Sequence, residues 1–390
     1  MASIKTPPDI KKKSVSLISL DDVKLDLESG AGKVNILKGI NLRIQEGDSV
    51  SIVGPSGAGK TSLMMVIAGI EAVSSGKINV SNHDLSIQMD TSDEWIHSRT
   101  GIRERRIADS EEATASMGCE AGRMAMEDAG VNPSEIDLLV VPTLISDMLF
   151  PSAASLIQTQ LELRNVTSFD LSAACSGFIY GLEVVSNMMR SGNYKHALVI
   201  GSEKLSAILD WEDRSTSVLF GDGAGAAVLT KVDDIDCGII DSYTGNDGSK
   251  AKLLCMPGGG TAMPATSESL ENRDHFLKMN GREVFKIAVR WMEQSAKIVL
   301  ERNNLTPEDI DLFIPHQANL RIIDALARSI KISKEKFFVN LDRYGNTSAA
   351  SIPIALHEAR QNGRIQTGNN VLMVAFGAGL TWGSTLIKWQ

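Results

Sequence analysis

Short apolar runs of strand length alternate with longer amphipathic patterns of helix length along most of the 390-residue chain. Leu138–Val140 and Val166–Leu171 are typical of buried strands, and helical patterns precede and follow them. Strands that alternate with helices in this way form mainly parallel sheets with helices on their faces. From about residue 91 to residue 390, the pattern therefore predicts a layered α/β fold.

This layered part contains a weak internal repeat. Val131–Val140 matches Leu305–Ile314 position by position, and an amphipathic helical pattern precedes each stretch. Each half then closes with a Gly-rich turn and a strand, at Phe220–Gly225 and at Phe376–Gly379. We therefore predict a duplicated α/β/α/β/α body whose halves span residues 91–235 and 236–390.

The first half lacks a counterpart of the strand Asp236–Ser242, which opens the second half. A sequence of different character occupies the expected place before Met89. Two strands from that sequence, Ser49–Val53 and Lys77–Val80, are candidates for the vacant position. Without either of them, one sheet of the body has a gap.

A phosphate-binding loop stands in the preceding segment, residues 14–90, which follows a polar tail at residues 1–13. Strand patterns cover Ser14–Ser19, Val34–Ile44 and Ser49–Val53, and an apolar helical pattern covers Ser62–Ala68. Between the last strand and this helix lie the glycines and the two side chains that such a loop needs: Gly54, Gly57, Gly59, Lys60 and Thr61. The glycines let backbone N–H groups surround phosphates, the lysine reaches the β/γ oxygens, and the threonine hydroxyl holds Mg²⁺. A chance Gly-rich turn is the alternative.

With Ile36–Leu42, Glu46–Asp48, Ala68–Ile70 and Ser75–Ile78, this loop resembles the first segment of the ABC-transporter ATPase family. The glutamine loop, signature sequence, acidic Walker B strand and switch histidine of that family do not follow it. The resemblance therefore implies weak ATP and Mg²⁺ binding without hydrolysis.

The character of the chain changes near Asp90, although Ser81–Gln88 fits either neighbour. Trp95 is followed at helical spacing by Arg99, the first residue of a basic run that ends at Arg106. An aromatic ring with several guanidinium groups suits a pocket for a nucleotide diphosphate. A solvated charged face is the alternative.

Cys175 lies on the turn between the strand Val166–Leu171 and the helical pattern Phe178–Met189. We expect the helix dipole and the unpaired N–H groups of the first turn to lower the pKa of this thiol. Its small neighbours leave room for a substrate. A buried structural cysteine is the alternative, and it is the interpretation we give to Cys119, Cys237 and Cys255.

Two further polar residues occupy related positions. His316 follows the strand Leu312–Ile314, and Asn346 lies on the turn that corresponds to the turn of Cys175. Alone, the histidine suits a core position and the asparagine a helix cap. The internal repeat brings all three residues together, and the trio predicts a catalytic centre.

Bulk composition narrows the function classes. The net charge of −9 and the pI of about 5.3 argue against nucleic-acid binding. No apolar run approaches the roughly 20 residues that span a bilayer, and we expect no metal site. Four cysteines without an N-terminal signal sequence favour a reducing cytoplasm.

The catalytic stretches resemble the thiolase superfamily and, within it, most closely the ketoacyl synthase III family. The matching stretches are Asp90–Ile96, Arg99–Arg106, Ser172–Gly177, Gly221–Ala226, Pro315–Asn319, Gly345–Ser351 and Phe376–Gly383. The resemblance implies a decarboxylative Claisen condensation that starts fatty-acid synthesis. A short acyl-CoA acylates a cysteine, and malonyl-[acyl carrier protein] supplies the carbon nucleophile. No cofactor is implied beyond this CoA thioester substrate, and the chain is expected to form a homodimer.

The resemblance also implies roles for individual residues. The catalytic residues would be Cys175, His316 and Asn346, and the backbone N–H groups of Cys175 and Ala378 would stabilise the oxyanion. CoA would be bound by Trp95, Arg99, Arg214 and Asn319. The acidic carrier protein would meet Arg321, and the acyl pocket would include Phe376 and, from the partner subunit, Phe150.

Two other interpretations stay open. One is a nucleotide-binding or transporter-associated protein whose synthase-like body is inactive. The other is a fusion of two partial genes that folds only in part.

Overall fold

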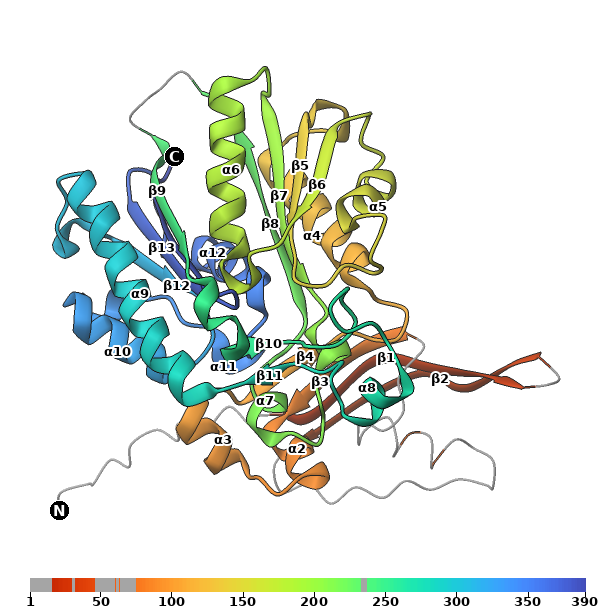
Figure 1. Cartoon of the computed structure of the whole chain (residues 1–390). Coiled ribbons are helices and arrows are strands. Elements are labelled where there is room, and N and C mark those ends of the chain that lie inside the picture. Colours follow the sequence, from red (N-terminus) through yellow and green to blue (C-terminus); the bar gives the residue numbers. More distant parts are fainter. Residues whose placement is uncertain (1–15, 30–31, 46–59, 61–62, 64–74, 233–236) are drawn as a thin grey trace, which may run out of the picture.

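The computed structural model describes residues 16–29, 32–45, 60, 63, 75–232 and 237–390 (Figure 1). The two halves of the body lie side by side in the upper part of Figure 1. A two-stranded ribbon from the front segment extends from the body at the lower right of the same view.

The first half contains a four-stranded sheet in the order β6-β5-β7-β8. Its strands are β5 (Leu138–Pro142), β6 (Thr167–Leu171), β7 (His196–Glu203) and β8 (Gly223–Thr230). β5 runs parallel to β6 and to β7, whereas β8 runs antiparallel to β7. Every residue of β5 and β7 is buried, which explains their nearly continuous apolar sequences.

The second half contains a four-stranded sheet in the order β12-β13-β14-β9. Its strands are β9 (Gly238–Asn246), β12 (Leu312–Pro315), β13 (Asn370–Gly377) and β14 (Thr381–Lys388). Only β12 and β13 are parallel. The prediction of mainly parallel sheets therefore holds for the first sheet and was wrong for the second. The connection from β13 to β14 is a tight turn, which is too short for the crossover that a parallel pair needs.

Five layers alternate through the body. The helices α6 (Gly177–Ser191) and α12 (Ser351–Gln361) form the middle layer, since their apolar faces share one core with strands of both sheets. The outer face of the first sheet is covered by α4 (Thr114–Ala129) and α5 (Ala153–Gln160). The outer face of the second sheet is covered by α9 (Gly281–Arg302) and α10 (Leu320–Ile330). The predicted α/β/α/β/α architecture is confirmed.

Shorter elements complete the body. They are α2 (Asn82–Gln88), α3 (Asp93–Thr100), α7 (Arg214–Ser217), α8 (Ser267–Glu271), α11 (Leu341–Tyr344), β10 (Leu254–Cys255) and β11 (Lys278–Met279). α2 packs with the body, because Leu85 is buried against Ile96 and Val218. In addition, the Asn82 Nδ2 donates to the carbonyl of Ile102 at 2.6 Å.

The front segment contributes three strands to an antiparallel sheet in the order β2-β1-β3-β4, whose fourth strand, β4, belongs to the body. Its strands are β1 (Ser16–Ser29), β2 (Gly32–Gln45), β3 (Ser75–Ser81) and β4 (Glu104–Ile107). β1 continues well beyond the predicted end at Ser19. Its pairing with β2 shifts register at its two adjacent aspartates, Asp21 and Asp22. Asp22 has a φ of 49°, and its backbone N–H donates to the Asn41 side chain at 2.9 Å.

Among the described residues, the first sheet lacks a counterpart of β9, as the internal repeat predicts. In the second half, β14 pairs with β13 on one side and with β9 on the other. In the part of the chain that the structure describes, β8 pairs only with β7. The candidate strand Lys77–Val80 lies in β3, which pairs with β1 and β4 instead. The other candidate, Ser49–Val53, falls outside the described residues.

Among the described residues, no helix has the length and apolar character that crossing a bilayer requires.

Candidate active site

Cys175 lies on a single 3₁₀ turn, Ala174–Ser176, that connects the end of β6 to the start of α6. The Thr381 hydroxyl fixes this turn by donating to the carbonyl of Ala173 at 2.9 Å. Gly377, the cross-strand partner of Thr381, approaches so closely that a Cβ atom there would lie 2.6 Å from the Cys175 nitrogen. The strand-to-helix turn predicted for this cysteine is thus present.

The electrostatic environment of the thiol differs from the expectation. Cys175 is only 8% exposed, and burial raises the pKa of its thiol to about 12. The Ser348 hydroxyl and the local backbone lower this pKa, and the Glu203 carboxylate raises it. The expected lowering of the pKa by the helix N-terminus was wrong, because desolvation of a thiolate outweighs the helix dipole at this depth.

His316 directly follows β12 and is held on two sides. Its backbone N–H donates to the carbonyl of Val374 at 2.8 Å, and its Nδ1 lies 2.7 Å from the Ser351 hydroxyl. Burial lowers the pKa of His316 to about 3, so the imidazole is neutral at physiological pH. A neutral imidazole whose Nδ1 accepts the serine hydroxyl carries its proton on Nε2, where it can donate a hydrogen bond.

Asn346 is positioned by backbone and side-chain hydrogen bonds. Its N–H donates to the carbonyl of Leu219 at 2.8 Å, and its carbonyl accepts the N–H of Gly221 at 3.0 Å. The Asn346 Oδ1 accepts the N–H of Ser348 at 2.9 Å. Since the oxygen of the amide is occupied in this way, its Nδ2 remains as the donating group.

The three predicted catalytic residues line one cavity of about 380 Å³, which we call the outer cavity. The predicted CoA-binding residues and Arg321 line the same cavity. These residues are Trp95, Arg99, Arg214 and Asn319. The structure therefore brings together residues that lie more than 200 positions apart in the chain.

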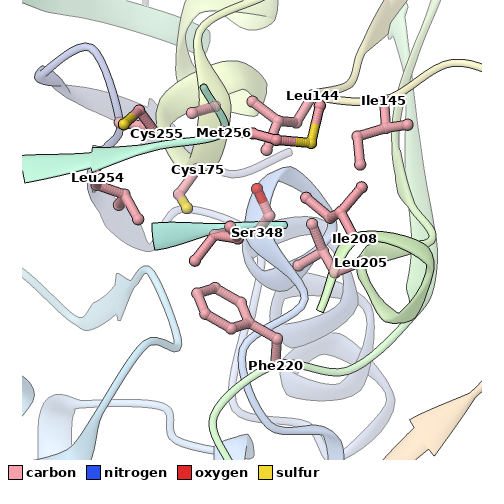
Figure 2. Close-up of a pocket in the computed structure, with 13 residues that line it drawn as sticks. Leu144, Ile145, Cys175, Leu205, Ile208, Phe220, Leu254, Cys255, Met256 and Ser348 are labelled. Atoms are coloured by element: carbon pink, nitrogen blue, oxygen red, sulfur yellow. The ribbon is translucent and has the colours of Figure 1, made fainter. Parts of the chain in front are cut away.

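A second, mainly apolar cavity of about 240 Å³ lies on the other side of Cys175 and is called the inner cavity here (Figure 2). Its wall comes from several separate loops. The lining includes Leu144, Ile145, Leu205, Ile208, Phe220, Leu254 and Met256. Cys175, Phe220 and Leu254 line both cavities, so the sulfur lies where the two meet.

Two guanidinium groups pack on the indole of Trp95 at the outer cavity. The Cζ atoms of Arg99 and Arg214 lie 4.5 Å and 4.6 Å from its ring centre. Arg214 also donates to the backbone carbonyl of Asp90. Nearby, the Nη2 of Arg321 donates to the carbonyl of Ser98 at 3.0 Å. This cationic and aromatic cluster can bind a phosphorylated aromatic ligand.

The remaining predicted site residues fall in different places. Ala378 lines the inner cavity, whereas Phe376, which we expect in the acyl pocket, lines the outer cavity. Phe150 lines neither cavity and is 84% exposed. Gly54, Gly57, Gly59 and Thr61 lie outside the described residues, and Lys60 is half-buried.

Sequence reasoning missed most of the inner cavity. Cys255, which we interpreted as structural, lines it, as do Phe220 and Ser348. Phe220 and Ser348 each lie inside a recognised stretch, Phe220–Gly225 and Gly345–Ser351, and that position is a signal that could have found them. The apolar residues of the wall carry no such signal, because apolar side chains in loops are equally typical of ordinary core positions.

Comparison with known proteins gives two kinds of match. Family models described as 3-Oxoacyl-[acyl-carrier-protein (ACP)] synthase III and as its C-terminal part match residues 169–248 and 300–389. A family model described as ABC transporter matches residues 37–121.

Individual relatives cover most of the chain. It is 52% identical over 311 residues to beta-ketoacyl-[acyl-carrier-protein] synthase III of Caldanaerobacter subterraneus subsp. tengcongensis. The aligned region spans 80% of this chain and 94% of that protein. A crystal structure of 3-oxoacyl-[acyl-carrier-protein] synthase III from Aquifex aeolicus has a TM-score of 0.74 at 49% identity, and covers 80% of this chain and 96% of that one. The corresponding Thermus thermophilus structure has a TM-score of 0.75 at 43% identity, and covers 80% of this chain and 95% of that one.

Proposed function

Since this chain belongs to the 3-oxoacyl-[acyl-carrier-protein] synthase III family, we propose that it is an acyltransferase that condenses a short acyl-CoA with malonyl-[acyl carrier protein]. The product is a 3-ketoacyl-[acyl carrier protein], and the reaction initiates fatty-acid synthesis. The observation that carries the proposal is the convergence of Cys175, His316 and Asn346 on one cavity.

In the first half-reaction, the Cys175 sulfur attacks the thioester carbonyl of the acyl-CoA, and CoA leaves as its thiol. The developing oxyanion accepts hydrogen bonds from the backbone N–H groups of Cys175 and Ala378. The inner cavity receives the acyl chain, because it is apolar and opens directly at the sulfur. Its volume of about 240 Å³ suits a short chain.

In the second half-reaction, malonyl-[acyl carrier protein] loses CO₂, and the resulting enolate carbon attacks the acyl-cysteine. The thioester oxygen of the enolate accepts hydrogen bonds from the His316 Nε2 and from the Asn346 Nδ2. The neutrality of His316 suits this role, since the neutral ring donates from Nε2 while Ser351 holds Nδ1.

The mouth of the outer cavity binds the nucleotide end of CoA. The adenine stacks on Trp95, and Arg99 and Arg214 hold the ring and the phosphates. A separation of 4.6 Å leaves no room for a ring between Trp95 and Arg214, so Arg214 rotates away when the base enters. Asn319 hydrogen-bonds the pantetheine, and Arg321 meets the acidic carrier protein.

We assign the chain to a homodimer in the cytoplasm. Leu149 and Phe150 are 91% and 84% exposed, and such a pair of apolar side chains is costly to leave in water. In the dimer, Phe150 reaches the acyl pocket of the partner subunit. The cysteines are free, which suits a reducing compartment.

We divide the chain where the character of its sequence changes, and place the ABC-ATPase-like fragment ahead of the synthase. We place the junction upstream of Asp90, because the 311 matched residues exceed the 301 residues from Asp90 to Gln390 and because α2 packs with the body. In the fragment, the phosphate-binding loop holds ATP and Mg²⁺ weakly and does not hydrolyse ATP.

The test is intact and peptide mass spectrometry after the purified chain is mixed with acetyl-CoA. An acetyl group on Cys175 is expected, together with its complete absence from a Cys175→Ala variant of unchanged melting temperature. Cys119→Ala is the matched control, since Cys119 is buried on α4 and lines neither cavity. A folded protein that acquires no acetyl group, or acquires it in Cys175→Ala, contradicts the proposed function.

A further inference from the structure

Glu203 is a carboxylic acid in the interior that has no part in the chemistry above. It ends the buried strand β7, and its side chain is 0% exposed. Its Oε2 accepts the N–H of Leu144 at 3.0 Å and the hydroxyl of Thr143 at 3.2 Å. A buried carboxylate is costly to keep, so its presence beside the nucleophile requires a reason.

The internal repeat explains how a carboxylate is held at this place. Glu203, the last residue of β7, is the counterpart in the repeat of Gly377, the last residue of β13. The turns Ala174–Ser176 and Ser348–Ala350 correspond as well, and the first residue of each has a φ of 48°. Gly377 approaches the N–H of Cys175, whereas the Glu203 carboxylate lies near the backbone of Ala349, the counterpart of Cys175, which lowers the pKa of that carboxyl. The carboxylate therefore occupies the counterpart of the oxyanion site.

Ser348 stands between Glu203 and the nucleophile. Its side chain lies beside Cys175 at the wall of the inner cavity (Figure 2). Among the described residues, neither Ser348 Oγ nor Glu203 Oε1 has a hydrogen-bond partner, and both atoms are buried. The Ser348 hydroxyl is nevertheless close enough to lower the pKa of both Cys175 and Glu203.

We propose that Ser348 and Glu203 form a proton relay that activates Cys175. The inference rests on the proposed function. As the sulfur forms its bond to the thioester carbon, the thiol proton passes to Ser348 Oγ and the hydroxyl proton of Ser348 passes to Glu203. When the bond between the carbonyl carbon and the CoA sulfur breaks, the same path returns a proton to the CoA thiolate. Glu203 is then a carboxylate again, and no other acid or base is consumed.

The acidities of the groups suit this path. Burial raises the pKa of Glu203 to about 7, which lets it take and release a proton near neutrality. A thiol whose pKa is about 12 needs such a base, because almost none of it is ionised at rest. Thr143, Leu144, Ser348 and Ala349 face the carboxylate with uncharged donors. Besides Cys175 itself, the titratable groups at the two cavities include Cys255 at the inner cavity and His316 at the outer cavity. His316 stays neutral.

The experiment measures the alkylation rate of Cys175 by iodoacetamide between pH 5.5 and 9. For the unmodified chain, the rate should rise through an inflection near the Glu203 pKa of about 7. Glu203→Gln and Ser348→Ala should each remove this inflection and slow alkylation at pH 7.5 by about 100-fold. The double variant should be no slower than either single one, because both act on one path. Glu203→Asp should recover part of the rate.

The matched control is Asp222→Asn. Asp222 is another buried carboxylate of raised pKa, but it accepts from Ser206 and Ala108 and not from Ser348. This variant should keep the inflection. If Glu203→Gln does not fold, Ser348→Ala still tests the relay, because this substitution removes only one oxygen atom at a cavity wall and should leave the fold intact. Unchanged rate and inflection in Ser348→Ala would overturn the relay.

The same proteins separate this inference from the proposed function. An unmodified chain that shows the alkylation inflection but acquires no acetyl group from acetyl-CoA contradicts the synthase activity and leaves the relay standing. A chain that is acetylated normally in Glu203→Gln and Ser348→Ala keeps the synthase activity and loses the relay.

Discussion

At the residue scale, burial decides the charge of the groups in the site. The pKa of Cys175 rises to about 12 and that of His316 falls to about 3, so both residues rest in their neutral forms. Both shifts have the same cause, which is the loss of water around a group that would otherwise be charged. Neutral groups can donate hydrogen bonds to a developing anion without first releasing a proton to solvent.

The acid sensitivity of folding should report the buried His316. Because its pKa is about 3 in the folded chain and about 6.5 in the unfolded chain, only the unfolded chain takes up this proton between those values. The contribution to the free energy of unfolding is complete above about pH 6.5 and falls as the pH drops below it. Between pH 7 and pH 5 the loss amounts to about 2 kcal/mol.

Urea unfolding at pH 7 and pH 5 measures this loss when the chain is compared with His316→Asn. Other titrating groups contribute to both proteins and cancel in the difference. The variant should lose about 2 kcal/mol less than the original chain on acidification. An equal loss in both proteins would mean that His316 is protonated in the folded state.

Individual residues also show which features of the site can be predicted from the sequence. Cys175, His316 and Asn346 were found because each stands at the end of a strand in a repeated pattern, and the fold brings such ends together. The acidity of the thiol was not foreseen, since the helix start is visible in the sequence while the depth of burial depends on packing. Glu203 was missed although an acidic residue at the end of an apolar strand is itself a signal.

At the scale of elements, the contact between α3 and α10 positions the mouth of the outer cavity. Gly101 caps the C-terminus of α3 with a φ of 82°, and a Cβ there would lie 2.6 Å from the Leu320 Cβ. Trp95 and Arg99 lie on α3, so any shift of this helix against α10 displaces both.

Gly101→Ala should therefore lower the free energy of unfolding by more than the ~1 kcal/mol of left-handed strain, and should raise the KM for acyl-CoA several-fold. Gly130→Ala is the matched control. Gly130 ends α4 with a φ of 64°, but a Cβ there would meet nothing within 4 Å. The control variant should lose only the free energy of unfolding that left-handed strain costs, and its KM for acyl-CoA should be unchanged. Equal KM values in both variants would mean that the contact with Leu320 does not position the cavity mouth.

The open edge of β8 gives a second prediction at this scale. β14 is paired on both sides, whereas β8 is paired with β7 only, within the ranges that the structure describes. Every second backbone N–H of β8 should therefore exchange with solvent much faster than its counterpart in β14. Hydrogen exchange followed by mass spectrometry measures this difference. Equal protection would show that some other part of the chain covers the edge.

The sequence predicted which strands belong to each half, because strands buried on both faces form continuous apolar runs such as β5 and β7. It did not predict the direction of every pairing, which depends on the length and path of each connection. The extent of β1 was also missed, because Asp21 and Asp22 interrupt the apolar pattern that the strand continues through a bulge.

At the scale of the whole molecule, the two parts of the chain meet through one sheet, and the described residues of the front segment line neither cavity. β3 of the front sheet pairs with β4 of the body. Every residue that lines the outer or the inner cavity is numbered 95 or higher. The front segment therefore affects the site only through the position of the elements it touches.

Lys60→Ala should for this reason leave the condensation with malonyl-[acyl carrier protein] within about two-fold of its original rate, while it weakens any binding of ATP. Lys60 is half-buried in the front segment. Lys38→Ala, at an exposed position of β2, is the matched control for loss of one positive charge. Steady-state condensation rates and equilibrium dialysis with ATP are measured on both variants. If Lys60→Ala alone slows condensation, the phosphate-binding loop is coupled to the active site through β3 and β4, and the front segment has become a regulator of the synthase.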